Sequence, residues 1–204
     1  IPAQPPLPIV ETVEPEQRGE RRVYVEYEAN PNLAIAYHKP EITHTDQYAL
    51  EVVESLLSGG RTARLYKSLI EEKRIAVMAR VYSGGSRYPD LFLIFVTPRY
   101  PHTAEEVEAA IYEELEKLKK EPPTEWELQK IKNQLEADFI RSLESTAGLA
   151  DEIGEYEAIA SWRYINTALD KIKAVTPEDV MRVAKKYFTR TNRTVAVLVN
   201  KEGA

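Results

Sequence analysis

Five short segments of the chain have the hydrophobic pattern of β-strands. Residues 23–28 alternate with period two, which predicts a strand with one buried face. Residues 91–96 are apolar throughout, which is typical of a central strand covered on both faces. The predicted strands are residues 23–28, 33–37, 77–82, 91–96 and 194–199.

Longer segments carry apolar residues at the three- to four-residue spacing of amphipathic helices. Thr124 and Glu127 have the spacing of a capping box, and Pro177 occupies the first helical position after another threonine. The predicted helices are residues 46–57, 62–73, 107–118, 124–143, about 147–162 and 176–187.

The order of these elements predicts the fold class. Two strands, two helices, two strands, four helices and a final strand follow one another along the chain. Short connections between strands favour antiparallel pairing. We therefore expect an α+β fold, a largely antiparallel sheet of about five strands covered by helices.

Two glycine pairs interrupt this pattern. Gly59-Gly60 follows the first predicted helix, where a residue without Cβ can adopt positive φ and end the helix. Gly84-Gly85 lies in the long loop between two predicted strands. Neither pair has the spacing of a phosphate-binding loop, so both are interpreted as turns.

Composition narrows the functional classes only slightly. The 204 residues suit one domain, and 43% apolar with 29% charged residues is ordinary for a globular protein. A formal charge of −6 argues against a nucleic-acid partner or an anionic membrane surface. The chain has no cysteine, and no apolar run reaches the roughly 20 residues of a membrane span.

The first 20 residues differ in composition from the rest. Five prolines precede residue 16, which favours an extended, semi-rigid segment, and there is no initiator methionine or signal-peptide pattern. Two interpretations stand side by side: a linker within a longer polypeptide, and an ordinary N-terminal tail. In either case the expected organisation is a proline-rich segment, 1–20, followed by one domain, 21–204.

Side chains for catalysis or metal binding are sparse. His38, His44 and His102 lack the spacing of convergent ligands, so structural or solvated roles are favoured. Glu106 and Glu113 lie two helical turns apart, a spacing that suits a ligand and its support, but a solvated acidic helix face is the simpler interpretation.

Local catalytic motifs are also missing. The sequence contains no H-x-x-E-H or H-E-x-x-H, so zinc hydrolysis is not encoded locally. Ser58, Ser83 and Ser86 have no neighbouring base in the sequence, which disfavours a nucleophilic role.

Six segments, in order along the chain, match the pattern of a known family. They are residues 46–50, 57–66, 69–73, 123–128, 139–144 and 175–180. Together they resemble the second, zinc-free domain of the pitrilysin/insulinase-like zinc peptidases, which include the mitochondrial processing peptidases. The resemblance runs from about Arg21 to Val199.

The resemblance implies a function. In such enzymes a homologous first domain binds zinc through H-x-x-E-H, and the second domain closes the other wall of a peptide-binding chamber, partly by adding the peptide to a sheet edge. We therefore expect no cofactor in this chain, zinc in a partner N-terminal domain or subunit, and a peptide substrate. The proline-rich segment is then the interdomain linker.

The same resemblance identifies two substrate-facing positions. Many members carry an arginine and a tyrosine, seven residues apart, that reach the substrate and the developing oxyanion. Here those positions are Ile70 and Val77, which cannot donate a hydrogen bond. We expect a catalytically inert domain, or a non-proteolytic structural subunit of the same family. Arg74, Arg80 or Tyr82 are less favoured substitutes for the missing pair, and an unrelated α+β binding module is the remaining alternative.

Overall fold

Five strands form one sheet in the computed structural model, which describes residues 14–200. The strand order is β1-β5-β2-β4-β3, and only the β1–β5 pair is parallel. The strands are β1 (Arg21–Tyr27), β2 (Asn32–Lys39), β3 (Ala76–Tyr82), β4 (Asp90–Pro98) and β5 (Arg193–Asn200). The expected α+β fold with a largely antiparallel sheet is confirmed.

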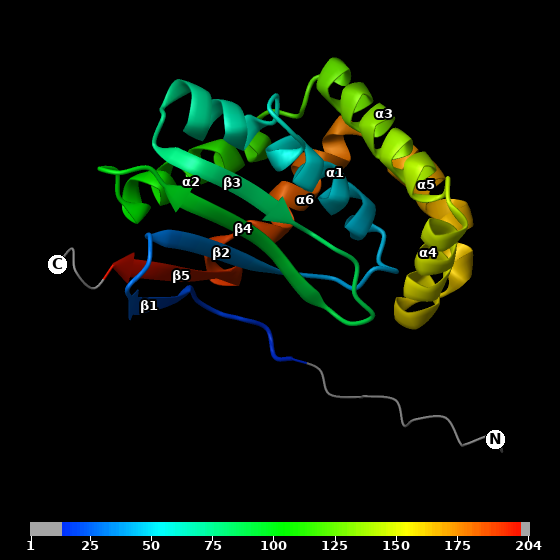
Figure 1. Cartoon of the computed structure of the whole chain (residues 1–204), viewed down its shortest axis with the longest axis horizontal. Coiled ribbons are helices and arrows are strands. Elements are labelled where there is room, and N and C mark those ends of the chain that lie inside the picture. The colour runs from blue at the N-terminus through cyan, green and yellow to red at the C-terminus, as the bar shows by residue number, and fades with distance from the viewer. Residues whose placement is uncertain (1–13, 201–204) are drawn as a thin grey trace.

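The helices form a layer against one face of this sheet (Figure 1). They are α1 (Asp46–Ser58), η1 (Tyr66–Glu72), α2 (Ala104–Lys120), α3 (Glu125–Ser142), α4 (Thr146–Ile159), η2 (Trp162–Tyr164), α5 (Ile165–Ala174), α6 (Pro177–Tyr187) and η3 (Arg190–Asn192). The core lies between the two layers, where α1 alone buries nine of its 13 residues.

Cross-strand partners show which residues belong to each face, because directly paired residues point to the same side of a sheet. One row on the helix side contains Leu33, Val96 and Val197, all at most 1% exposed. The opposite face has no described helix across it (Figure 1). A row on this open face crosses all five strands through Val23, Ala196, Ala34, Phe95 and Arg80.

Two expectations about the sheet are wrong for the same reason. All seven residues of β1 are exposed, so this strand has no buried face. In β4, Phe92, Ile94 and Val96 are fully buried but Phe95 is 41% exposed, so this central strand is covered on one face only. Both predictions assumed that apolar residues are covered within the chain.

The expected pairing of the first two strands is also wrong. β1 and β2 do not form a hairpin, because β5 lies between them and pairs with both. The hairpin between β3 and β4 is confirmed, with a bulge between Ala76 and Met78.

The helix predictions are largely confirmed, with two differences. The second helix becomes π-helical over Tyr66–Glu72, and α5 was not predicted at all. Its apolar residues Ile165, Ala168, Leu169 and Ile172 do have helical spacing, so the sequence contained a signal for α5 that the prediction overlooked. The capping boxes Thr124–Glu127 and Thr176–Asp179 are both formed.

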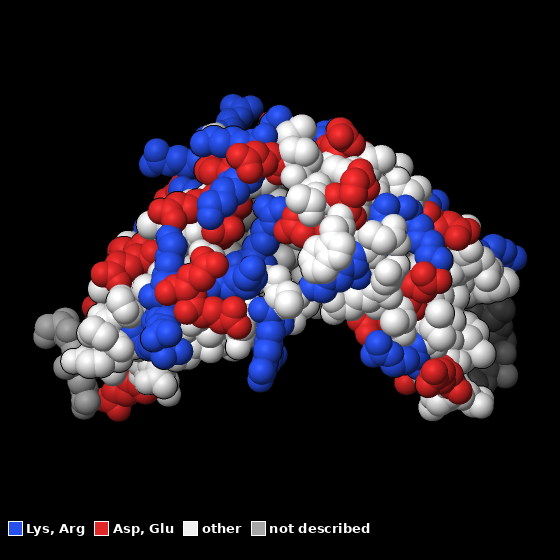
Figure 2. All heavy atoms as spheres, turned by 90° about the horizontal axis from the view of Figure 1, so that it is seen from above, with Lys and Arg blue, Asp and Glu red and all other residues white. Residues whose placement is uncertain are grey.

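The molecule has the shape of an arch when viewed edge-on (Figure 2). The body of sheet and helices forms one limb, and α4, which has no buried residue, forms the other (Figures 1 and 2). The hollow therefore lies in front of the open sheet face. None of the described helices is long and apolar enough to cross a membrane.

Most of the predicted linker, residues 1–13, lies outside the described residues. Its last part is bound to the first residue of β5: Gln17 donates its amide to the Arg193 carbonyl at 2.8 Å, and Glu20 pairs with the Arg193 guanidinium.

Candidate functional site

The helix–turn–strand segment 66–77 builds the region that contains both predicted substrate-facing positions. η1 ends at Glu72, and Arg74, two residues later, adopts φ 56°. The Ile75 amide closes the turn on the Leu69 carbonyl at 2.9 Å, a bond one residue wider than that of a Schellman motif. Arg74 therefore occupies a position where glycine is ordinarily preferred.

Ile70 and Val77 lie in different environments. Ile70 is half-buried on η1 and packs against the hydrophobic core. Val77 is 54% exposed at the β3 bulge and lines a surface pocket. Of the two positions, Val77 alone is among the residues that line this pocket.

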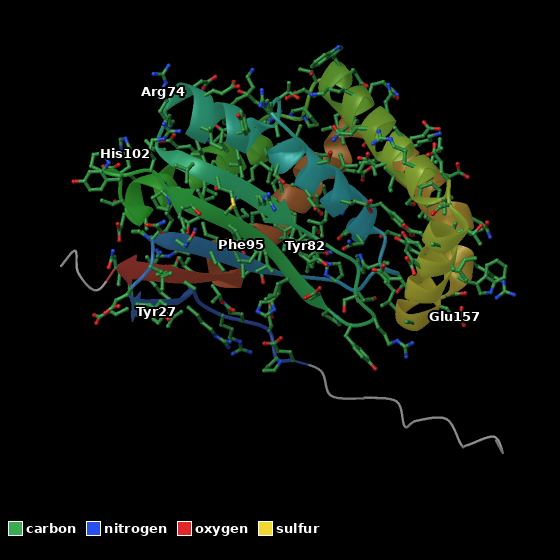
Figure 3. All side chains as sticks on the ribbon, viewed as in Figure 1. Tyr27, Arg74, Tyr82, Phe95, His102 and Glu157 are labelled. Atoms are coloured by element: carbon green, nitrogen blue, oxygen red, sulfur yellow. The ribbon has the colours of Figure 1, made fainter. Side chains whose placement is uncertain are left out.

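This pocket is formed at one end of the sheet and has a volume of about 800 Å³. Its wall includes Val77, the fully exposed ring of Tyr100, and His102, which is labelled in Figure 3. Residues from the β1–β2 turn and the end of β5 complete it. Val77, Pro31, Leu198 and the Tyr100 ring give it a largely apolar wall, to which His102 adds a polar ring.

The open sheet face continues from this pocket as a shallow apolar groove of about 490 Å³. Ala34 and Ala196 form its floor, and Val25, Phe95 and Leu198 rise beside them. Tyr27, Phe95 and Tyr82 on this face are labelled in Figure 3. Small residues flanked by large apolar ones leave room for another chain to pack on the sheet.

The two edges of the sheet differ in exposure. At the β3 edge, the Val81 amide donates to Ser58 Oγ at 3.0 Å and the Ser83 amide to Glu54 Oε2 at 2.9 Å. Side chains of α1 therefore occupy part of this edge. Strand β1, at the opposite edge, is exposed along its whole length.

The histidines do not converge. His38 contacts Gln17 at 3.2 Å, His44 Nδ1 accepts from the Asp46 amide at 3.0 Å, and His102 contacts Glu106 at 2.8 Å. Across residues 14–200, no three His, Asp or Glu side chains gather as metal ligands.

The glutamate pair considered from the sequence is also separated. Glu106 is bound by His102, and Glu113 forms an ion pair with Lys73. Both carboxylates are exposed, in agreement with a solvated helix face.

A polar stripe along the buried helix α1 was not predicted from the sequence. Gln47, Glu51, Glu54 and Ser58 follow one another at helical spacing and turn toward a pocket beside the β3–β4 loop. The available signal was the persistence of polar residues at every turn of an otherwise apolar helix.

Comparison with known proteins identifies the family. Residues 1–135 match the sequence model described as the peptidase M16 inactive domain. The chain belongs to this family.

Its relatives include proteases and a respiratory-complex subunit. The zinc protease PqqE of Helicobacter pylori is 31% identical over 91% of this chain and 42% of its own length. The crystal structure of a protease from Helicobacter pylori superposes with a TM-score of 0.87 at 30% identity, over 91% of this chain and 45% of that one. Cytochrome b-c1 complex subunit 2 of mouse is 25% identical over 85% of this chain and 38% of its own length.

The M16 inactive domain described here thus spans less than half the length of these relatives. The family resemblance inferred from the six segments between residues 46 and 180 is confirmed, and the chain is an inactive peptidase domain of zinc-protease-like proteins.

Proposed function

We propose that this M16 inactive domain is the non-catalytic C-terminal domain of a zinc metalloendopeptidase and that its open sheet face forms one wall of the peptide-binding chamber. The observation that carries the proposal is the apolar, concave face: Ala34 and Ala196 form its floor and Phe95 is 41% exposed beside them. Exposed apolar patches of this kind mark binding surfaces. Zinc belongs to a homologous N-terminal domain or subunit, which forms the facing wall.

The open face can be tested with a matched pair of aromatic truncations in the full-length protein. Phe95→Ala removes a ring from the open face, and Trp126→Ala removes a ring that is 72% exposed on the helix layer. We expect Phe95→Ala to raise KM for peptide cleavage several-fold, since truncating an aromatic contact costs about 1 to 2 kcal/mol.

Trp126→Ala should leave KM unchanged, because this ring lies away from the open face. Equal KM values for both variants and the unmodified protein contradict the chamber-wall role.

A second candidate is a non-proteolytic structural or partner subunit. Ile70 and Val77 in place of an arginine and a tyrosine favour it, because neither can bind an oxyanion. The similarity to a subunit of the cytochrome b-c1 complex supports it as well.

Restoring the pair distinguishes the two candidates. In the full-length protein, Ile70→Arg with Val77→Tyr should raise kcat for peptide cleavage at least tenfold if the chain is a chamber wall that lost its clamp. Ile70→Leu with Val77→Thr serves as the control, since it changes both positions without adding charge or a phenol. A double variant that folds but shows no gain favours the structural subunit.

A further inference from the structure

A second pocket, of about 360 Å³, lies where α1, the β3–β4 loop, α3 and α4 meet. Its charged lining residues are all acidic: Glu51 and Glu54 from α1, Asp138 from α3 and Glu155 from α4. No lysine, arginine or histidine lines it among the described residues. The pocket therefore favours a positively charged ligand.

Two polar groups in this pocket have no partner among residues 14–200. Glu51 makes no hydrogen bond or ion pair, although Glu54 binds the Ser83 amide at 2.9 Å. Ser83 is only 1% exposed, and its Oγ has no hydrogen-bond partner. A buried hydroxyl without a partner costs about 1 to 3 kcal/mol, a cost that a ligand hydrogen-bonded to Ser83 would recover.

The backbone of Ser83 is fixed, which keeps its hydroxyl in place. The Ser83 amide donates to Glu54, and the Ser83 carbonyl accepts from Gln47 Nε2 at 2.9 Å. Gln47 in turn accepts from the buried Lys39 ammonium at 3.0 Å. Lys39 thus lies behind Gln47 and is not among the residues that line the pocket.

Two aromatic rings line the pocket together with the carboxylates. Tyr156 and Tyr164 pack at 5.0 Å between ring centroids, and Tyr48, behind them, stacks on Tyr164 at 5.9 Å. Aromatic faces attract cations and also cover an aliphatic stem. A pocket lined by carboxylates and rings matches a cation at the end of a short hydrocarbon chain.

We propose that this pocket binds the side chain of one lysine or arginine residue of a peptide, with Glu51 and Glu54 on the cation and Ser83 Oγ as an added hydrogen-bond acceptor. The proposal does not depend on the chamber-wall role, because the pocket is built from this chain alone.

The charge state of Glu51 supports this assignment. Burial and the nearby Glu54 together raise its pKa to about 7, and Lys39 opposes the rise. An entering cation stabilises the ionised form, so binding strengthens as pH rises through 7. The ionisable groups facing Glu51 are Glu54, Lys39, Tyr48, Asp138, Glu155, Tyr156 and Tyr164.

The test is calorimetric titration of the chain at pH 8 with two pentapeptides, Ala-Ala-Arg-Ala-Ala and the same peptide with neutral citrulline. We expect saturable binding of the arginine peptide and at least tenfold weaker binding of the citrulline peptide. Glu51→Gln should weaken binding of the arginine peptide at least tenfold, and Ser83→Ala should weaken it several-fold. Glu116→Gln, an exposed acid of α2 outside the pocket, should change nothing.

Chemical denaturation of each variant confirms that it is folded at the titration temperature. Equal affinity for arginine and citrulline peptides, or unchanged affinity in both folded Glu51→Gln and Ser83→Ala, overturns the proposal. Failure of the Phe95 test leaves this result unaffected, since Phe95 does not line the pocket.

Discussion

At the scale of single residues, two positions in the segment 59–77 adopt positive φ. Gly60 has φ 94°, and Arg74 has φ 56° at the end of η1. The glycine suits its conformation, whereas the arginine carries a Cβ into a region where side chains are disfavoured. These two turns fix where η1 begins and where β3 starts, and hence where Val77 lies.

Exchanging the residue types at these turns has opposite effects. Gly60→Ala should destabilise the chain by about 1 kcal/mol, although a Cβ there meets no atom within 4 Å. Arg74→Gly should be neutral or stabilising by up to about 1 kcal/mol, since relief of strain is partly offset by unfolded-chain entropy. Chemical denaturation measures both.

Gly154→Ala is the control, because this glycine lies inside α4 with open space and ordinary helical conformation. It should stabilise by up to about 1 kcal/mol through helix propensity. Destabilisation by Arg74→Gly contradicts the assignment of strain to that turn.

At the scale of elements, the first turn of α1 is attached to α6 through one buried carboxylate. Asp46 is 2% exposed and accepts from Arg182 at 2.6 Å, Lys186 at 2.7 Å and the Tyr187 hydroxyl at 2.7 Å. Burial raises the pKa of Asp46, but hydrogen bonds from Lys186, Arg182 and Tyr187 outweigh burial and hold the pKa well below its usual range.

Loss of this carboxylate should loosen the contact between α1 and α6. We expect Asp46→Asn to destabilise the chain by about 2 to 3 kcal/mol at pH 7, because charged hydrogen bonds are lost while Tyr187 stays buried. The pKa is lowered on folding, so the stabilisation is complete above about pH 4 and is lost as pH falls toward the folded pKa.

Denaturation midpoints of both proteins between pH 7 and pH 2 test this prediction, and the difference between them should shrink below pH 4. Glu116→Gln removes an exposed ion pair with Lys119 and should change little at any pH. A stability difference for Asp46→Asn that does not vary with pH is incompatible with the assigned role of its charge.

Local sequence rules predicted the elements whose determinants lie within a few residues. The capping boxes at Thr124 and Thr176 and the stripe of α2 gave α2, α3 and α6 close to their observed bounds. Pairing of β1 with β5 joins segments about 170 residues apart, and nothing local encodes it. Helix α5 has apolar residues at helical spacing, but it was missed because no side-chain cap marks where it begins.

The candidate site was predictable only in part. The alignment of Val77 with the family's tyrosine position follows from the segments 57–66 and 69–73. The exposure of Val77, however, depends on a β-bulge that no sequence pattern predicts. The acidic pocket required tertiary contacts between α1, α3 and α4, which are far apart in sequence.

At the scale of the whole molecule, the apolar residues left uncovered are the basis of the proposed function. The alternating pattern of β1 and the continuous apolar run of β4 predicted more burial than the described chain provides. The uncovered side chains share the open face in front of the hollow (Figures 1 and 2). In the proposed function a homologous zinc-bearing domain and a peptide cover them.

The most direct test of this account measures the zinc content and the peptide cleavage of the chain alone, and then of the chain together with its zinc-bearing half. The account predicts that the 204 residues alone neither retain zinc through dialysis nor cleave peptides. It also predicts that cleavage by the zinc-bearing half increases when this chain is added. Stoichiometric zinc in the isolated chain, cleavage by it, or a zinc-bearing half whose activity is unaffected by it would contradict the account.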